Sequence, residues 1–404
     1  MNIVIAGGGV AGLEALLGLH AVAGDRVKLT LVAPDHNFTY RPLAVGEPFG
    51  LGHAHRVPLC RFTHAAGADL IIDRAVGVAD RARELRLQDA GTLRFDALLV
   101  APGGRAVAGV DGATTWWPSG DSDAYGGMLR DLDEGYAKRI AIVVPPGAVW
   151  PLPAYELALM TAGEVREMGH DDAHVIVVTP ERTPLSLLGD EASRAVAEEL
   201  RWAGVELRTG AVAHREGSEL VLDPDGTRLD VDRVLAVPRL LGPALGGLPV
   251  DEEGFVLAGD DGLVQGCERT WAAGDGVASP LKFGGLATHQ ARAAIAGIAR
   301  LGGIADAPDP GEPVIHGRLL VGHRMRRLRP SGDAAGAPLW WPQGKVAGEY
   351  LPRWLAEHGV GPAYAATPPE GVRVAQSLRL MRGAEAEYLR NLARRYRVDG
   401  PVTA

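Results

Sequence analysis

The chain has 404 residues, a length that suggests two or three domains. Of these residues 47% are hydrophobic and 23% charged, a composition typical of a globular protein. Its formal net charge of −9 argues against nucleic acid as a main partner. Only two cysteines occur, Cys60 and Cys267, which excludes a disulfide framework and a CxxC redox pair. We expect two buried thiols in a reducing cytoplasm, with a single bridge between them as the alternative.

The sequence also indicates where the protein lies relative to membranes. The first residues start a strand at once, without a basic segment and a cleavage site, so no signal peptide is expected. No run of about 18 apolar residues occurs, so no membrane-spanning segment is expected. We expect a cytoplasmic protein. Peripheral contact with the inner face of a membrane is left open, and so is a homodimer.

The first part of the chain alternates strands with a helix. Residues 3–6 form a continuous apolar run, as a buried parallel strand requires. A helix is predicted over 12–22 and a second strand over 27–32, after which a more polar stretch begins. A further buried strand over 97–101 ends in Pro-Gly-Gly. This order is that of a doubly wound α/β unit.

The same order then recurs. The predicted elements are strands over 139–144, 175–178 and 205–207 and helices over 154–168 and 191–203. After a strand over 232–237 the chain returns to the first unit, with a strand at 270–275, a helix of small residues over 285–301 and a linker at 305–313. A strand over 318–321 and a long helix over 372–397 follow. The spacing favours two doubly wound units with a C-terminal region.

A GxGxxG motif separates the first strand from the first helix. Gly7 permits the tight turn, Gly9 lets the backbone approach a pyrophosphate, and Gly12 lets the helix pack on the sheet. The helix then offers free N–H groups to the phosphates. A turn without a ligand is the alternative, which the strand and helix on either side disfavour. The acidic residue expected after the second strand is replaced by Ala33, and Asp35 is either its substitute or a solvated turn residue.

A second element ends the strand at 270–275 in Gly274-Asp275. A carboxylate there can accept a hydrogen bond from a polyol hydroxyl of a cofactor, and the next helix can aim its N-terminus at a ring that gains negative charge on reduction. Alone, such a pair is often a helix cap. Together with the GxGxxG motif it is specific.

With these motifs the chain resembles the pyridine nucleotide-disulfide oxidoreductase superfamily, flavoproteins with two dinucleotide-binding domains. Within it, residues 1–350 look most like the sulfide:quinone oxidoreductase branch, which is related to type II NADH dehydrogenases. The resemblance is carried by FTYRP (38–42), FDALLVAPG (95–103), AGD (273–275) and PLKFGGLA (280–287). It implies FAD as cofactor and places Lys282 near the flavin; a surface salt bridge is the alternative for this lysine.

The departures from this branch concern its chemistry. The Pro-Ala-Tyr-Glu sequence at 153–156 is present, but Trp150 stands where the branch has a redox cysteine. Neither Cys60 nor Cys267 falls at a catalytic position of the family, so no persulfide relay is expected. In the second unit, Pro145 and Pro146 replace glycines of the phosphate loop and donate no N–H groups.

Three further features leave alternatives open. Glu181, after the strand at 175–178, is either a ribose ligand or a solvated turn carboxylate. Trp340 and Trp341 either wall a flat aromatic acceptor or form an interdomain hydrophobic plug or a dimer contact. The arginine-rich helix predicted over 372–397 either lies on an anionic membrane or packs on protein. No histidine spacing predicts a metal site.

The predicted fold class is therefore α/β, with two Rossmann-like dinucleotide-binding domains and a C-terminal region. We expect a discontinuous FAD-binding domain at 1–112 and 240–310, a second dinucleotide-binding domain at 113–239 and a C-terminal domain at 311–404. The residues expected to bind FAD are Gly7, Gly9, Val10, Ala11, Gly12, Ala33, Asp35, Arg41, Pro42, Val76, Ala101, Pro102, Gly103, Gly274, Asp275, Lys282, Gly285 and Leu286.

The predicted function is that of an FAD-dependent oxidoreductase that passes electrons from a small-molecule donor to an acceptor such as a quinone, without a cysteine relay. Two alternatives stand beside it: an NAD(P)H-dependent flavoprotein reductase, and a non-catalytic flavin-binding protein. The sequence names neither the donor nor the catalytic residues.

Overall fold

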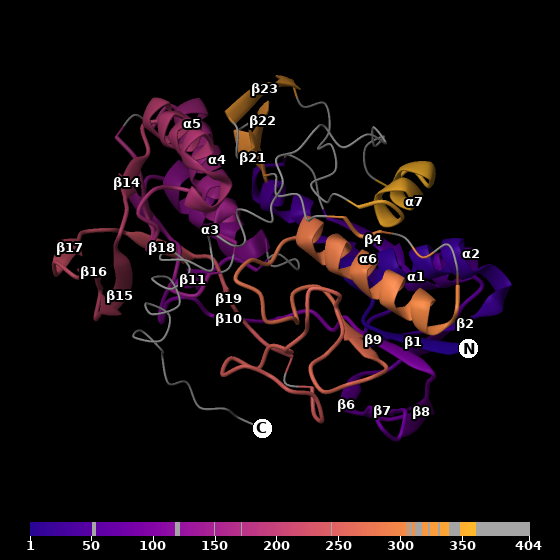
Figure 1. Cartoon of the computed structure of the whole chain (residues 1–404). Coiled ribbons are helices and arrows are strands. Elements are labelled where there is room, and N and C mark those ends of the chain that lie inside the picture. The colour runs from indigo at the N-terminus through magenta and orange to yellow at the C-terminus, as the bar shows by residue number, and fades with distance from the viewer. Residues whose placement is uncertain are drawn as a thin grey trace.

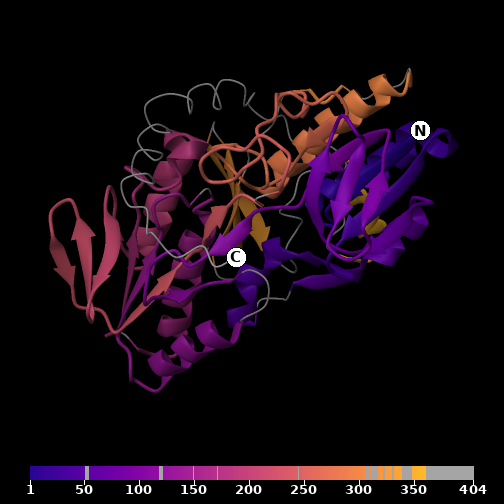
Figure 2. The ribbon, with the colours of Figure 1, turned by 90° about the horizontal axis from the view of Figure 1, so that it is seen from below.

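A computed structural model describes residues 1–50, 54–117, 122–148, 150–170, 172–243, 245–304, 307, 309–311, 317–321, 324–329, 332–338 and 348–360. The predicted helix over 372–397 and the Trp340–Trp341 pair lie outside these residues. Two α/β units lie side by side, the first on the right of Figure 1 and the second on the left; Figure 2 shows the same pair from below.

The first unit is built on a five-stranded parallel sheet in the order β20-β9-β1-β2-β5. Its strands are β1 (Asn2–Ala6), β2 (Lys28–Ala33), β5 (Asp69–Ile72), β9 (Ala97–Val100) and β20 (Thr270–Ala272). The last strand comes from far along the chain, so the unit is assembled from two separate stretches. The central strands are apolar on both sides because both faces of the sheet are covered.

The residues of β1 alternate between two cores. Ile3 and Ile5 pack with α1 (Val10–Ala23), α6 (Gly284–Leu301) and α7 (Leu351–Glu357). Val4 and Ala6 face the other core, which includes the antiparallel strands β6 (Ala75–Ala79), β7 (Glu84–Leu87) and β8 (Thr92–Arg94). Successive side chains of a strand point to opposite faces, so one short apolar run serves two layers.

The second unit repeats this plan. Its parallel sheet has the order β11-β18-β12-β13-β14, so β18-β12-β13-β14 corresponds to β9-β1-β2-β5. The strands are β11 (Thr114–Thr115), β12 (Arg139–Val143), β13 (His174–Val178), β14 (Glu206–Arg208) and β18 (Arg233–Ala236). Helices α3 (Ser122–Asp133), α4 (Leu152–Glu167) and α5 (Asp190–Trp202) share one core, and strands β15 (Val212–Glu216), β16 (Glu219–Asp223) and β17 (Thr227–Leu229) share the other.

The remaining elements connect the units or cover them. The two passages between the units pair as antiparallel strands, β10 (Arg105–Val107) with β19 (Arg239–Leu241). The C-terminal part forms a sheet of β21 (Gly317–Val321), β22 (Arg324–Arg329) and β23 (Gly332–Pro338) near α4 and α5, and then α7. Shorter elements are η1 (Gly24–Arg26), β3 (Asn37–Tyr40), η2 (Arg41–Phe49), β4 (His55–Pro58), α2 (Leu59–Ala65) and η3 (Ser186–Leu188).

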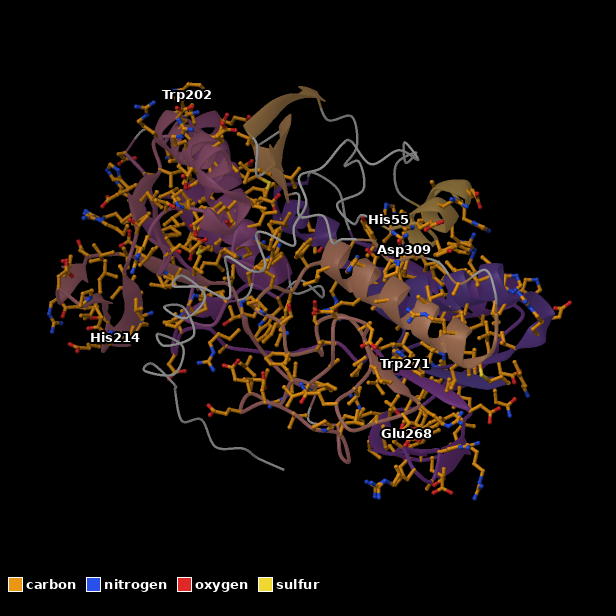
Figure 3. The ribbon with its side chains drawn as sticks, in the orientation of Figure 1. His55, Trp202, His214, Glu268, Trp271 and Asp309 are labelled. Atoms are coloured by element: carbon orange, nitrogen blue, oxygen red, sulfur yellow. The ribbon has the colours of Figure 1, made fainter. Side chains whose placement is uncertain are left out.

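Two tryptophans mark opposite regions of the molecule in Figure 3. Trp271 lies in β20 of the first sheet and is 4% exposed, whereas Trp202 ends α5 and is 62% exposed. The predicted α/β class with two doubly wound units is confirmed. None of the described helices is long and apolar enough to cross a membrane.

Candidate cofactor site

The glycine loop between β1 and α1 packs tightly on the strand end beside it. Gly7 has φ +133°, and a Cβ there would lie 2.0 Å from the carbonyl oxygen of Ala101. A Cβ on Gly12 would lie 1.9 Å from the carbonyl oxygen of Gly7. Both positions therefore exclude any side chain because of the fold itself.

Gly9 differs from these two glycines. It is exposed, it directly precedes α1 with φ −87° and ψ −169°, and a Cβ there would meet no atom within 4 Å. The fold gives no reason for a glycine at this position. No side chain caps the start of α1, so the N–H groups of Val10 and Ala11 lie at an open helix N-terminus. This cradle fits the pyrophosphate of a dinucleotide.

The end of β2 carries the residues expected near the adenosine. Ala33 is buried, and a Cβ on Gly8 would lie 3.1 Å from the Cβ of Ala33, so a small residue suits this contact. Asp35 is exposed in the following turn, where either of its predicted roles is open to it. Val76 lies on β6 and is 43% exposed, so its side chain is accessible to a ligand.

The Gly274-Asp275 element meets the glycine loop. Gly274 has φ +84°, its N–H donates to Oε1 of Gln290 at 2.8 Å, and a Cβ there would lie 3.1 Å from the Cβ of Ala11. The strand end at 101–103 adjoins the same loop, since a Cβ on Gly276 would lie 3.1 Å from the carbonyl oxygen of Gly103 and 3.5 Å from the ring of Pro102. The two predicted FAD motifs thus lie together. Gln290, which orients this loop, carried no signal in the sequence.

Three charged residues from separate segments surround the same place. Burial raises the pKa of the Asp275 carboxyl, and the positive charges of Lys282 and Arg41 oppose that rise. Arg41 is exposed at the start of η2, where Pro42 follows it. The structure therefore brings Arg41, Asp275 and Lys282 close enough for their charges to interact.

Lys282 is buried, with 5% of its surface exposed, so the surface salt bridge considered for it is wrong. Its Nζ donates to the carbonyl oxygen of Val277 at 2.5 Å and lies 3.7 Å from the ring centroid of Phe255. Burial lowers the pKa of Lys282 to about 8, with Asp275, Asp251 and Glu253 opposing the shift. At neutral pH the amine is still mostly a buried cation, which suits a ring that becomes negative on reduction.

Helix α6 begins beside Lys282, at the junction of the two units. Phe283 precedes the helix without a side-chain cap, and Gly285 lies in its first turn. Leu286 belongs to the core of the second unit, not the first. Trp150, from the loop after β12, stacks on Phe283 with ring centroids 4.7 Å apart and an angle of 18°. The loop that should bind a second nucleotide therefore contacts the start of α6.

Of the two predictions for Glu181, the solvated turn carboxylate is wrong. It is 2% exposed, and its Oε2 accepts hydrogen bonds from the hydroxyl of Tyr155 at 2.5 Å and from Thr179 at 3.2 Å. It is not a solvated turn carboxylate, because the chain folds α4 over it. Burial and the neighbouring Glu181 both raise the pKa of Tyr155 well above its usual value, so Tyr155 stays a hydroxyl donor. A ribose ligand would have to displace this bond.

The expectation of two buried thiols is wrong. Cys60 is exposed near the start of α2, and Cys267 is only partly buried; both are free. Burial and the charge of Asp80 raise the pKa of Cys267 to about 11, which keeps it a thiol at neutral pH. In the described part of the chain, no group of three or more His, Cys, Asp or Glu residues could hold a metal ion.

Comparisons with known proteins agree with this architecture. The family described as pyridine nucleotide-disulphide oxidoreductase matches residues 1–296. The ferredoxin reductase component of chlorobenzene dioxygenase from Cupriavidus sp. (strain PS12) is 26% identical over 359 residues, covering 83% of this chain and 81% of the relative. The sulfide-quinone reductase of Aquifex aeolicus (strain VF5) is 27% identical over 173 residues, covering 42% of this chain and 40% of the relative.

Solved structures share the fold at low identity. The sulfide:quinone oxidoreductase of Aquifex aeolicus superposes with a TM-score of 0.72 at 18% identity, covering 82% of this chain and 86% of that one. NDH2 of Plasmodium falciparum, in complex with NADH, gives 0.63 at 12% identity, covering 83% and 91%. The chain therefore belongs to the pyridine nucleotide-disulphide oxidoreductase family, and it is an FAD-dependent oxidoreductase.

Proposed function

We propose that the flavin of this protein accepts electrons from a small-molecule donor and passes them to a flat aromatic acceptor of the quinone class, without a cysteine relay. The observation that carries the proposal is the stack of Trp150 on Phe283. Trp150 stands where the sulfide:quinone oxidoreductase branch has a redox cysteine, and the stack lies beside Lys282 and the start of α6. Aromatic faces of this kind favour planar ligands.

The residues of the first unit have distinct roles in this proposal. Gly7, Gly9 and Gly12, with the first N–H groups of α1, hold the pyrophosphate, and Asp275 holds the ribityl chain. Lys282 lies where its positive charge lowers the energy of the reduced ring. FAD supplies the redox chemistry when bound, and the chain supplies position and electrostatics.

We further propose that the domains divide at 112, 239 and 310, as the two sheets suggest.

The other residues predicted to bind FAD complete this assignment. Most of them lie at the strand ends around the glycine loop or at the start of α6, whereas Arg41 and Pro42 begin η2 and Val76 lies on β6. They are Val10, Ala11, Ala33, Asp35, Arg41, Pro42, Val76, Ala101, Pro102, Gly103, Gly274, Gly285 and Leu286.

The test is the reoxidation of reduced flavin. Protein reduced anaerobically with dithionite is mixed with a short-chain quinone, and flavin absorbance is followed by stopped flow. The rate should saturate with quinone concentration. Trp150→Ala should raise the half-saturating concentration by about twofold to tenfold, since an aromatic pair is worth about 0.5–1.5 kcal/mol. Trp202→Ala is the matched control, because Trp202 is exposed at the end of α5. A quinone rate no faster than that with buffer alone would refute the proposal.

A second candidate is an NAD(P)H-dependent reductase that passes electrons to an iron–sulfur protein. The relative that favours it is the ferredoxin reductase component, which aligns over most of this chain. Rapid anaerobic bleaching of the flavin by NADH or NADPH would favour this candidate over the quinone proposal.

The quinone proposal also implies contact with a membrane surface, since quinones dissolve in lipid. Co-sedimentation with anionic lipid vesicles measures that contact.

A further inference from the structure

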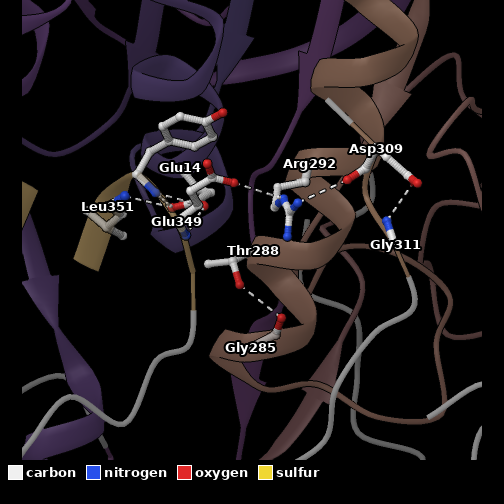
Figure 4. A network of polar contacts seen from close by, with 9 residues as sticks. Glu14, Gly285, Thr288, Arg292, Asp309, Gly311, Glu349 and Leu351 are labelled. Atoms are coloured by element: carbon white, nitrogen blue, oxygen red, sulfur yellow. Dashed lines mark hydrogen bonds and ion pairs between the residues drawn. The ribbon is translucent and has the colours of Figure 1, made fainter. Parts of the chain in front are cut away.

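Glu14 is a fully buried carboxylate one turn into the helix of the glycine loop, with 0% of its surface exposed. It accepts backbone hydrogen bonds from the N–H groups of Glu349 at 2.7 Å, Tyr350 at 3.2 Å and Leu351 at 2.7 Å (Figure 4). An ionised carboxylate can only accept hydrogen bonds, so inside a protein it depends on such donors. The donors come from the start of α7, at the far end of the described chain.

Glu156 occupies the same position in the second unit. Glu14 is the fifth residue of α1 and Glu156 the fifth residue of α4, and these two helices follow the corresponding strands β1 and β12. Glu156 is 1% exposed, and its Oε1 accepts the backbone N–H of Leu320 at 2.9 Å. The equivalent glutamate of each unit therefore binds the backbone of the C-terminal region.

Both attachments lie next to helix starts at the cofactor site. A Cβ on Gly348 would lie 2.9 Å from Cγ2 of Thr288 and 3.1 Å from Oε2 of Glu14. Thr288 in turn donates to the carbonyl oxygen of Gly285 at 2.9 Å, in the first turn of α6 (Figure 4). On the other side, Glu156 lies in the first turns of α4, and Trp150 in the loop just before that helix stacks on Phe283.

An arginine strengthens the first attachment. Nε of Arg292 on α6 lies 3.5 Å from the carboxylate of Glu349, and its Nη2 donates to the carbonyl oxygen of Asp309 at 3.0 Å. Arg292 also lies near Glu14, whose pKa burial raises while the backbone N–H groups and Arg292 oppose the rise. The segment that covers Glu14 therefore also supplies the backbone donors that its carboxyl group binds next to the glycine loop.

We propose that Glu14 and Glu156 are positioning residues that dock the C-terminal region onto the two units, and that FAD binding and this docking stabilise each other. The coupling follows from the geometry. Undocking removes these backbone donors from both carboxyl groups, and one of the two lies a single turn from the N–H groups that must face the pyrophosphate. FAD in turn orders the starts of α1 and α6, on which the segment at 348–351 rests. The inference depends on FAD binding and not on the nature of the acceptor.

The test measures both directions of this coupling on the full chain. In the wild type, removal of FAD should speed tryptic cleavage after residue 304 by at least tenfold, while cuts within the first sheet change far less. Glu14→Gln and Glu156→Gln place an amide NH₂ among the backbone donors. Each should speed the same cleavage at least tenfold, because each leaves at least one buried backbone N–H group without its acceptor.

The affinity for FAD separates docking from general loss of stability. Glu14→Gln should raise the dissociation constant for FAD at least tenfold and Glu156→Gln at least threefold, and both should change the visible circular dichroism of the bound flavin. Glu167→Gln is the matched control, an exposed glutamate on the same helix as Glu156. Wild-type affinity and an unchanged flavin spectrum in both variants would overturn the proposal. If the variants are insoluble, the wild-type experiment decides: C-terminal cleavage within twofold with and without FAD would overturn it.

Discussion

Gly9 offers a way to remove the cofactor without disturbing the fold. A Cβ at this position meets no atom within 4 Å, and the backbone is at φ −87°, which any residue adopts. We therefore expect Gly9→Val to fold, with a cost of up to about 1 kcal/mol from the poorer helix N-cap. The valine side chain projects into the space in front of α1, where we propose that the pyrophosphate binds. It should keep the phosphates from at least two backbone N–H groups.

The expected loss of affinity is large. Hydrogen bonds to a charged group contribute about 1.5–3 kcal/mol each, so losing two weakens binding by about 3–6 kcal/mol. That corresponds to a dissociation constant for FAD raised by roughly two to four orders of magnitude. Purified Gly9→Val should be colourless, whereas the wild type should carry FAD near one per chain.

The assay compares apo-proteins to keep the two effects separate. Thermal unfolding of the apo-forms reports the fold, and titration with FAD reports the site. Gly163→Ala on α4 is the control, since its Cβ also meets nothing within 4 Å but lies in the second unit. It should bind FAD normally. Normal FAD content in Gly9→Val would refute the assignment of the glycine loop.

The other predictions concern thiols, nicotinamide and a buried amine. Replacing both Cys60 and Cys267 by Ser should leave flavin reduction by the physiological donor largely intact; loss of reduction in a folded double variant would show that the active site is misplaced. Nicotinamide cofactors should bind weakly, because the loop from 145 to 153 contains four prolines, which donate no N–H groups to a pyrophosphate, and the bulky Trp150. A low-micromolar dissociation constant for NADH or NADPH would overturn this prediction. For Lys282, burial lowers the pKa from 10.5 to about 8, so the unfolded chain binds more protons between these values and stability should rise with pH there. Between pH 8 and 10.5 the free energy of unfolding of the apo-protein by guanidinium should increase by roughly 3 kcal/mol more than that of Lys282→Met. Parallel pH profiles of the two proteins would contradict the lowered pKa.

Several features followed from the sequence alone. The GxGxxG loop, the apolar runs of β1 and β12 and the Gly-Asp strand end are local patterns, and each depends on the backbone conformation of a few neighbouring residues. For this reason the α/β class and the repeat of two doubly wound units could be predicted, and the family resemblance that these motifs carry implied FAD as the cofactor. The proline-rich loop and Trp150 were also visible as departures from a nucleotide-binding loop.

Other features depend on contacts between residues far apart in the chain, and only the tertiary structure decided them. Lys282 is buried with its Nζ against the ring of Phe255 and the carbonyl oxygen of Val277, and a PLKFG sequence does not predict these contacts. Glu181 is covered because α4 brings Tyr155 over it. Glu14 read as one more helical residue, since the donors that it binds lie 335 to 337 residues further along the chain. Burial of a charge is a property of the assembled fold, whereas a turn is a property of its own residues.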